Sequence, residues 1–396
     1  MAEELSYVLI TPYTIMKSRT GGVIARLLSR TDLELVGAQI IAPDQEVTEK
    51  YASSVEKSLL SKGDKTFAKV LGDYIRENFP PMPNGRRERV MLLLFRGENA
   101  CEKLYNIVGR LSMRTKRDVV TGETIRDTYA DLVTNRNGEI SYFEPAVLTP
   151  PNYESALEKL KIFAEFAGTQ TNIVESSTKD DSTSLERTLV IIKPDNWRHP
   201  STKPGNIIDM LSRTGLRIIG CKIYQMSVAE GLEFYGPVRD VLRRKLSPII
   251  GKKAKELLES ELELKFEDKT EERLTEIAGI PYADDQFFRI VEFMSGVRPD
   301  KCTCDRMNSP GLVKCMVLIY EGKHAIKKIR DVLGPTDPTK APGGTIRRDF
   351  GQDVMVNTAH ASDAPESVVR EMGIVNIKVN NVANIIKEFL SKKGYN

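Results

Sequence analysis

The chain has 396 residues, of which 40% are hydrophobic and 29% charged, as is typical of globular proteins with packed cores. Its net charge of +3 is too small to predict a surface that binds nucleic acid, so we expect no such partner. We find no apolar run long enough for a membrane span, and the five cysteines favour a reducing cytoplasmic location over a disulfide scaffold.

The two halves of the sequence resemble each other. An apolar run ends at Pro12 in the first half and at Pro194 in the second. The sequence Leu-Ser-Arg-Thr follows at 28–31 and again at 211–214, and Thr-Ile-Arg ends at Arg126 and at Arg347. The offset between matches grows from 182 (194 minus 12) to 221 (347 minus 126), so the second half contains extra sequence. This pattern predicts an internal duplication.

The duplication predicts the domain organisation. We expect a first domain at 1–168, a polar linker rich in Ser and Thr at 169–186, and a second domain at 187–396. The extra sequence lies at about 236–285, where long charged stretches favour helices. We expect this insertion to be a surface helical excursion that acts as a lid or as an interface.

The order of elements in the second half is recoverable from hydrophobic periodicity. It predicts strands at 188–193, 216–225, 315–320 and 353–356. It predicts one helix around Ile207 to Leu211, between the first two strands, and another at 323–333, before the last strand. The order βαββαβ is typical of a ferredoxin-like sandwich, an antiparallel sheet with helices on one face. We therefore predict an α+β protein with two ferredoxin-like domains and a helical insertion in the second.

Residues 357–363 place one histidine, His360, between an apolar strand pattern and a helix start. Asp363 can cap that helix, with Glu366 completing a capping box. A histidine held on both sides is a candidate nucleophile, although a lone histidine is more often an ordinary surface or core residue. Arg347, in a nearby glycine-rich loop, suits a phosphate because its guanidinium offers paired donors.

Four motifs together carry a family resemblance. They are Thr-Leu-Val-Ile-Ile-Lys-Pro-Asp at 188–195, Gly-Pro-Thr-Asp-Pro at 334–338, Thr-Ile-Arg at 345–347 and Asn-Thr-Ala-His-Ala-Ser-Asp at 357–363. In this order they resemble nucleoside diphosphate kinase, and no P-loop sequence competes with that interpretation. The resemblance implies that His360 takes the γ-phosphate of a nucleoside triphosphate, becomes a phosphohistidine, and passes the phosphate to a nucleoside diphosphate in a ping-pong scheme.

The resemblance also implies roles for matching residues. Lys193 would reach the phosphates and ribose, Asn357 would bond the ribose hydroxyl, and the β- and γ-phosphates would be gripped by Arg330, Thr336 and Arg347. Mg²⁺ would arrive with the nucleotide, held mainly by phosphate oxygens, so no metal ligands are expected in the protein. Cys302, Cys304 and Cys315 lack a regular fourth ligand for zinc.

Further matches surround the histidine. Tyr235 corresponds to an active-site tyrosine, Ser362 and Glu371 to the support behind the imidazole, and the nucleotide base would lie between Phe288 and Val354. The sequence departs from the family pattern at Ala361, where glycine is usual. The insertion also separates Tyr235 from Phe288 more than is usual. His199 and His324 lie outside every motif and are not expected to be catalytic.

The first half lacks most of these residues. Thr11 stands in place of Lys193, Tyr105 near the place of Arg330, and the segment 141–146 near that of His360, although Arg126 is retained. We predict a catalytically silent domain that forms an internal pseudo-dimer with the second, or an anion site at Arg126 that serves regulation. Homo-oligomers remain an alternative assembly. The alternative function is a weakly active nucleotide-binding or scaffold protein that retains the kinase fold.

Overall fold

The structure is a computed structural model that describes residues 3–61, 63–111, 122–175, 177 and 185–395. The chain forms two compact units. The larger comprises Met1–Ile223, Met316–Val369 and Asn376–Asn396, and the smaller comprises Tyr224–Cys315 and Arg370–Val375. Part of the predicted linker, residue 176 and residues 178–184, lies outside the described residues, and the predicted domain boundaries stay a prediction.

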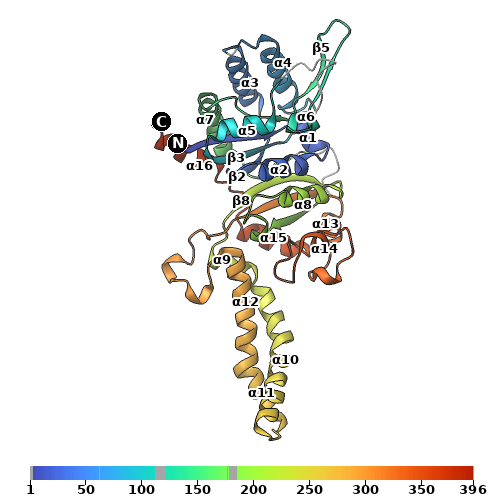
Figure 1. Cartoon of the computed structure of the whole chain (residues 1–396), viewed down its shortest axis with the longest axis vertical. Helices are drawn as coiled ribbons and strands as arrows, with labels where there is room; N and C mark the ends of the chain where they lie inside the picture. Colours follow the sequence, from blue (N-terminus) through green and yellow to red (C-terminus); the bar gives the residue numbers. More distant parts are fainter. Residues whose placement is uncertain (1–2, 62, 112–121, 176, 178–184, 396) are drawn as a thin grey trace. The chain divides into compact units, whose positions relative to one another are not determined.

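The larger unit contains two four-stranded sheets with the same strand order (Figure 1). In the first the order is β2-β3-β1-β6, and in the second it is β8-β9-β7-β10, so each has the first and third strands of its copy at the centre. The strands are β1 (Glu3–Ile10), β2 (Glu34–Ile41), β3 (Val90–Glu98), β6 (Val147–Leu148), β7 (Glu186–Ile192), β8 (Arg217–Tyr224), β9 (Cys315–Gly322) and β10 (Ala359–Ala361). The ferredoxin-like duplication is therefore confirmed.

Helices follow the strands at matching places in the two copies. The first copy has α1 (Pro12–Met16), α2 (Thr20–Ser29), α3 (Gln45–Leu60), α4 (Lys65–Asn78), α5 (Ala100–Val108), α6 (Ile125–Tyr129) and α7 (Tyr153–Thr169), and a hairpin of β4 (Asp131–Thr134) and β5 (Ile140–Glu144). The second has α8 (Lys203–Ser212), α13 (Ala325–Leu333), α14 (Ile346–Phe350) and α15 (Pro365–Ile374). Local sequence explains several helix starts: Asp44, Asp64 and Asn152 each accept a bond from a backbone N–H three residues on.

Helices α2 and α8 join the two copies into one core. Val23, Ile24 and Leu27 of α2 share a single buried cluster with apolar residues of α8. The helices approach closely because glycines meet at the crossing: a Cβ on Gly21 would lie 2.4 Å from the backbone nitrogen of Asp209 and 2.5 Å from the carbonyl oxygen of Gly205. The two helices can lie this close only because Gly21 and Gly205 have no side chain.

Substitution of Gly21 by alanine should therefore destabilise the protein. The added methyl group would meet backbone atoms, which cannot rotate away, so we expect a loss of about 3 kcal/mol in the free energy of unfolding, at the upper end for overpacking. Denaturant unfolding measures this loss. Gly236→Ala is the matched control, because a Cβ there meets nothing within 4 Å and should change stability little. Equal stability of the two variants would contradict the close crossing.

The C-terminal helix α16 (Val382–Lys392) packs against the first copy, beside α7 (Figure 1). Its apolar residues Val382, Ile386 and Phe389 belong to the same buried cluster as Phe163 and other residues of the first copy. Just before the helix, the side-chain amide of Asn380 donates to the carbonyl oxygens of Ala38 (2.9 Å) and Cys221 (3.1 Å). Helix α16 thus completes the hydrophobic core of the first copy.

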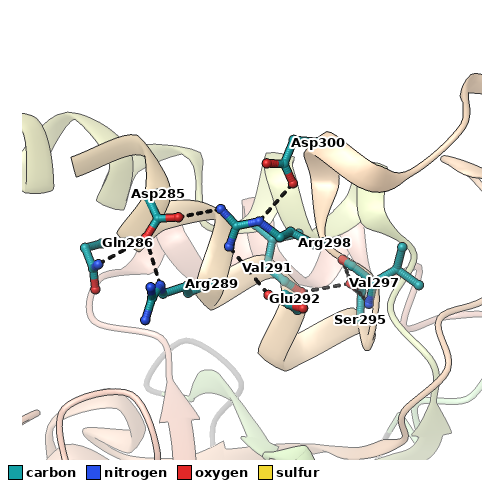
Figure 2. A network of polar contacts seen from close by, with 9 residues as sticks. All are labelled: Asp285, Gln286, Arg289, Val291, Glu292, Ser295, Val297, Arg298 and Asp300. Carbon is teal, nitrogen blue, oxygen red and sulfur yellow. Dashed lines mark hydrogen bonds and ion pairs between the residues drawn. The ribbon is translucent and has the colours of Figure 1, made fainter. Parts of the chain in front are cut away.

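The smaller unit is helical, as predicted for the insertion. It contains α9 (Val228–Phe234), α10 (Gly236–Leu262), α11 (Asp268–Leu274), a π-helical turn at Thr275–Gly279 and α12 (Ile280–Ser295). The segment after α12 is fixed by Arg298, whose guanidinium bonds Asp285 and forms ion pairs with Asp300 (2.9 Å) and Glu292 (3.6 Å), as Figure 2 shows. Buried Ala283, Phe287 and Val291 form one face of α12.

Two expectations need correction. Residues 353–356 were predicted to be the last strand, but they form bends, and the strand is β10 at Ala359–Ala361. The carboxylate of Asp353 accepts bonds from the backbone nitrogens of Met355 and Val356, both at 2.7 Å, which turns the chain before any ladder can form. Asp363 was predicted to cap the helix after His360, but that helix, α15, begins at Pro365, and the Asp363 carboxylate accepts a bond from the Ser367 hydroxyl at 2.7 Å.

Three further features bear on the class of protein. Among the described residues, no helix is long and apolar enough to cross a membrane. All five cysteines are free thiols. In the part of the chain that the structure describes, no three His, Cys, Asp or Glu side chains are arranged to hold a metal ion.

Candidate active site

His360 lies on β10, the edge strand of the second sheet. It is opposite Ile191 of β7, and its side chain is half-buried. The chain reaches β10 through Thr358, whose φ of +77° is rare for a β-branched residue and turns the backbone sharply. The backbone nitrogen of Lys193 donates to the carbonyl oxygen of Thr358 at 3.0 Å, so the strand that carries the histidine is tied to the end of β7.

Lys193 is buried next to the segment that leads to the histidine. Its ammonium group donates to the side-chain oxygen of Asn357 at 2.6 Å and to the carbonyl oxygen of Met355 at 3.3 Å. The Asn357 amide in turn donates to the carbonyl oxygens of Val354 (2.7 Å) and Thr336 (3.2 Å). Lys193 and Asn357 therefore fix the loop before β10, and the Lys193 ammonium group is a cation bound to that loop.

Burial, and then the nearby Arg347 guanidinium, lower the pKa of Lys193 to about 8. The charged form of this lysine is the one that can attract phosphate, so affinity for a nucleotide should fall as pH rises through 8. We expect kcat/KM, which reports groups of the free enzyme, to decline above that pH. In Lys193→Arg the decline should move to higher pH, because a guanidinium keeps its proton. An identical profile for both proteins would exclude Lys193 from phosphate binding.

Arg347 joins the loop at Gly334 to the histidine strand. Its two terminal nitrogens donate to the carbonyl oxygens of Gly334 (2.9 Å) and Ala359 (3.0 Å). Ala359 directly precedes His360, so this guanidinium fixes the backbone at the candidate nucleophile. Gly334 ends α13 with a φ of +82°, and a Cβ there would lie 2.8 Å from the Thr345 hydroxyl, so glycine is required at this turn.

Arg330 and Thr336 lie on the exposed side of the same region. Arg330 lines a hollow of about 360 Å³ with Glu186, His324 and Asp363. The pKa of Asp363 is lowered, first by the hydrogen bond from Ser367 and also by the charges of Arg330 and His360. Arg330, Asp363 and His360 are thus close enough to interact electrostatically.

The remaining predicted residues fall into two groups. Ser362, two residues after His360, is buried, whereas Val354, in the bend before His360, is 59% exposed. Tyr235, Phe288 and Glu371 belong to the smaller unit. Tyr235 is buried beside the Phe234 ring, at 4.9 Å between centroids, and Phe288 on α12 lies 6.0 Å from the Arg298 guanidinium. Glu371 is buried on α15, and Arg370 donates to it at 3.3 Å.

Sequence reasoning missed Asn196. It is buried, and its side-chain amide donates to the carbonyl oxygens of Lys193 (3.0 Å) and Thr358 (2.8 Å). It therefore stabilises both the turn after β7 and the left-handed residue before β10. Its position could have indicated this role. Asn196 lies three residues after Lys193 in a turn that contains Pro194, and an Asn side chain in a turn commonly bonds the backbone.

The first copy retains the framework of this region without its reactive groups. Arg126 donates to the carbonyl oxygens of Gly109 and Val147, the same pattern that Arg347 makes with Gly334 and Ala359. Since Val147 pairs with Ile10 as Ala359 pairs with Ile192, the residue in the place of His360 is Leu148. The alignment of His360 with residues 141–146 was therefore wrong.

Other substitutions in the first copy follow the same register. Thr11 replaces Lys193, and its hydroxyl bonds Glu144 (2.9 Å) and the carbonyl oxygen of Ala146 (3.0 Å). Lys159, eleven residues after Leu148, stands where Glu371 is eleven residues after His360. Its buried ammonium donates to the hydroxyls of Ser58 and Ser155, both at 2.7 Å. A cavity of about 190 Å³ lies beside Lys159 and Leu148.

Comparison with known proteins identifies the family. The family model described as nucleoside diphosphate kinase matches residues 301–379. A nucleoside diphosphate kinase of Staphylothermus marinus is 30% identical over 192 residues, which cover 48% of this chain and 93% of the relative. One from Cereibacter sphaeroides is 30% identical over 189 residues, covering 48% and 91%.

The chain belongs to the nucleoside diphosphate kinase family. It is thus a kinase, a phosphotransferase that acts on nucleotides. Among solved structures, the Aquifex aeolicus nucleoside diphosphate kinase is 25% identical, covers 49% of this chain and 99% of its own, and has a TM-score of 0.30. A kinase of Borrelia burgdorferi with bound vanadate and ADP is 19% identical, with coverages of 50% and 93% and a TM-score of 0.29.

Proposed function

We propose that the second copy transfers the γ-phosphate of a nucleoside triphosphate to a nucleoside diphosphate by a ping-pong mechanism through His360. One observation supports the proposal: Lys193 and Arg347 both bond the segment directly before His360, Lys193 at the side-chain oxygen of Asn357 and Arg347 at the carbonyl oxygen of Ala359. Two cations are thus bound to the segment that leads to a half-buried imidazole on an edge strand. That combination suits the attack of a neutral nitrogen on an anionic phosphorus centre.

In this mechanism a ring nitrogen of His360 attacks the γ-phosphorus. The bond from phosphorus to the bridging oxygen breaks, and the nucleoside diphosphate leaves with the electron pair. A second nucleoside diphosphate then takes the phosphoryl group from the histidine by the reverse step. Lys193, Arg330 and Arg347 neutralise the phosphate oxygens, and Ser362 supports the imidazole.

Further roles rest on the family resemblance. Asn357 would bond the ribose hydroxyl, Thr336 the phosphates, and Tyr235 and Glu371 would support the imidazole; the base would lie between Phe288 and Val354. Mg²⁺ would be carried by the nucleotide and would neutralise its phosphates. The cationic side chains of Lys193, Arg330 and Arg347 suit a nucleotide that brings its own Mg²⁺.

The first copy is proposed to be catalytically silent. Leu148 cannot accept a phosphoryl group, and the bonds of Thr11 to Glu144 and Ala146 occupy the place of the lysine. Its role would be that of an internal partner, since α2 and α8 already share a core as two subunits of a dimer would. The alternative of a scaffold with little turnover is disfavoured by the retention of Lys193, Arg347 and His360 in the second copy.

A chase experiment tests the proposal. Protein incubated with γ-labelled ATP and freed of nucleotide should carry a label that is acid-labile and base-stable. Addition of unlabelled GDP should move this label to GTP within one turnover. Transfer that requires ATP and GDP to be present together, with no label retained by the protein, would rule out the ping-pong scheme.

A further inference from the structure

A further cavity, with polar and apolar lining, lies in the larger unit where the two copies meet. It has a volume of about 450 Å³, enough for a nucleotide-sized molecule. Its walls come from both copies: the end of α1 and the start of α2, the segment before β3, and the end of α8 with the start of β8. No residue assigned above to the active site lines it.

Positive charge dominates this cavity. Three arginines line it, Arg86, Arg89 and Arg217, against one carboxylate, Glu88. Glu88 is already ion-paired with Arg86. The cavity walls therefore carry an excess of two positive charges, and guanidinium groups are the donors best suited to bind phosphate oxygens in pairs.

Arg89 and Arg217 are held close together in spite of their like charges. Arg89 donates to the carbonyl oxygen of Ile218, next to Arg217, at 2.6 Å. Burial, and then the charge of Arg217, lower the pKa of Arg89 to about 10; Glu88 and Glu321 act in the opposite direction. Glu321 is itself paired with Arg187 at 2.8 Å. A dianion between the two guanidinium groups would relieve this repulsion.

The rest of the lining suits the other parts of a nucleotide. The ten-residue helix α2 begins at this cavity with Thr20 and Gly21, and no side chain caps its N-terminus, so its first backbone N–H groups favour an anion. Apolar side chains, among them Met16 and Leu216, also line the cavity. The lining thus offers both cationic and apolar side chains.

We propose that this cavity is a second nucleotide site, which binds the phosphates of a nucleoside di- or triphosphate between Arg89 and Arg217 and the base against Met16 and Leu216. The site belongs to both copies, because Arg89 comes from the first and Arg217 from the second. No histidine is among its lining residues, so it binds without transfer through a phosphohistidine. This gives the first copy a nucleotide-dependent role that is separate from catalysis.

Calorimetric titration of the full chain with ADP, without Mg²⁺, tests the proposal. The wild-type protein should bind two ADP molecules per chain, Lys193→Ala should retain the arginine site, and Arg217→Gln should retain only the active site. Arg213→Gln is the matched control, since Arg213 is an exposed arginine close in sequence that does not line the cavity, and it should keep both sites.

Met16→Glu provides a second variant that does not depend on a buried arginine. Met16 is 59% exposed at the rim, so a glutamate is tolerated there and should weaken ADP binding to the cavity at least about tenfold by charge repulsion. A single wild-type site that Lys193→Ala removes would overturn this proposal and leave the proposed function intact. A single site that is weakened only by Arg217→Gln and Met16→Glu would support the cavity as a nucleotide site and contradict the proposed function. Two sites unchanged in both cavity variants would also overturn it.

Discussion

Replacement of His360 by alanine should abolish labelling of the protein by γ-labelled ATP and reduce phosphate exchange by roughly 10⁴-fold or more, the scale for loss of a covalent nucleophile. The reason is that the variant lacks the imidazole that the proposed mechanism uses as the phosphoryl acceptor, while Lys193 and Arg347 still hold the segment before position 360 through Asn357 and Ala359. Scintillation counting of protein separated from nucleotide measures the label. Label that persists in the variant would show that the phosphoryl group is carried elsewhere.

The chain supplies its own controls for that experiment, because it contains only three histidines. His324 precedes α13 in a left-handed conformation, with a φ of +56°, and is exposed. His199 lies in the exposed segment before α8. Alanine at either position should leave the amount of labelled protein unchanged. A loss of label in His324→Ala equal to that in His360→Ala would point to a phosphohistidine on α13.

The second large effect is expected at Arg347. Arg347→Ala should slow transfer by roughly 10²–10³-fold, as expected when a charge-stabilising donor is lost. The structure gives two reasons for this loss: a cation near the transferred phosphate disappears, and the carbonyl oxygens of Gly334 and Ala359 lose their shared donor. Single-turnover transfer from labelled protein to GDP measures the chemical step. An unchanged rate would remove Arg347 from the mechanism.

Arg126 makes the matched variant, because it forms the same pair of bonds in the first copy, to Gly109 and Val147. Arg126→Ala therefore removes an equivalent structural contact where no histidine is present. Comparable losses of stability, with a slow transfer step only in Arg347→Ala, would separate the role of the guanidinium in catalysis from its role in holding the backbone. Equal losses of transfer rate in both variants would mean that the effect is structural.

Much of the fold could be predicted because its signals are local. Apolar runs located β7, β8 and β9 to within two residues, and the repeated motifs revealed the duplication. The last strand was missed because β10 has only three residues, and its Ala-His-Ala sequence carries no strand propensity. Its position depends on pairing with β7, which lies about 170 residues earlier in the chain and leaves no local pattern.

The candidate site shows the same division. Lys193, Arg347 and Asn357 lie in motifs, and their hydrogen bonds link the loops that those motifs form. Leu148 could not be recognised as the counterpart of His360, because the first copy has an additional hairpin, β4–β5, that shifts the alignment. Only the pairing of β6 with β1 defines that position. The cavity lined by Arg86, Arg89 and Arg217 could not be predicted for a related reason. Its residues come from both copies and share no motif.

The docking of α16 on the first copy means that the first copy can complete its core only after residues 382–392 have been synthesised. A nascent chain of residues 1–168 would expose the apolar surfaces of α7 and β2 that Val382, Ile386 and Phe389 cover in the finished protein. The first copy thus stays incomplete until residues 382–392 have been made, and we expect a fragment of residues 1–168 alone to aggregate. Removal of the second copy together with α16 would therefore also uncover apolar surface on the first copy.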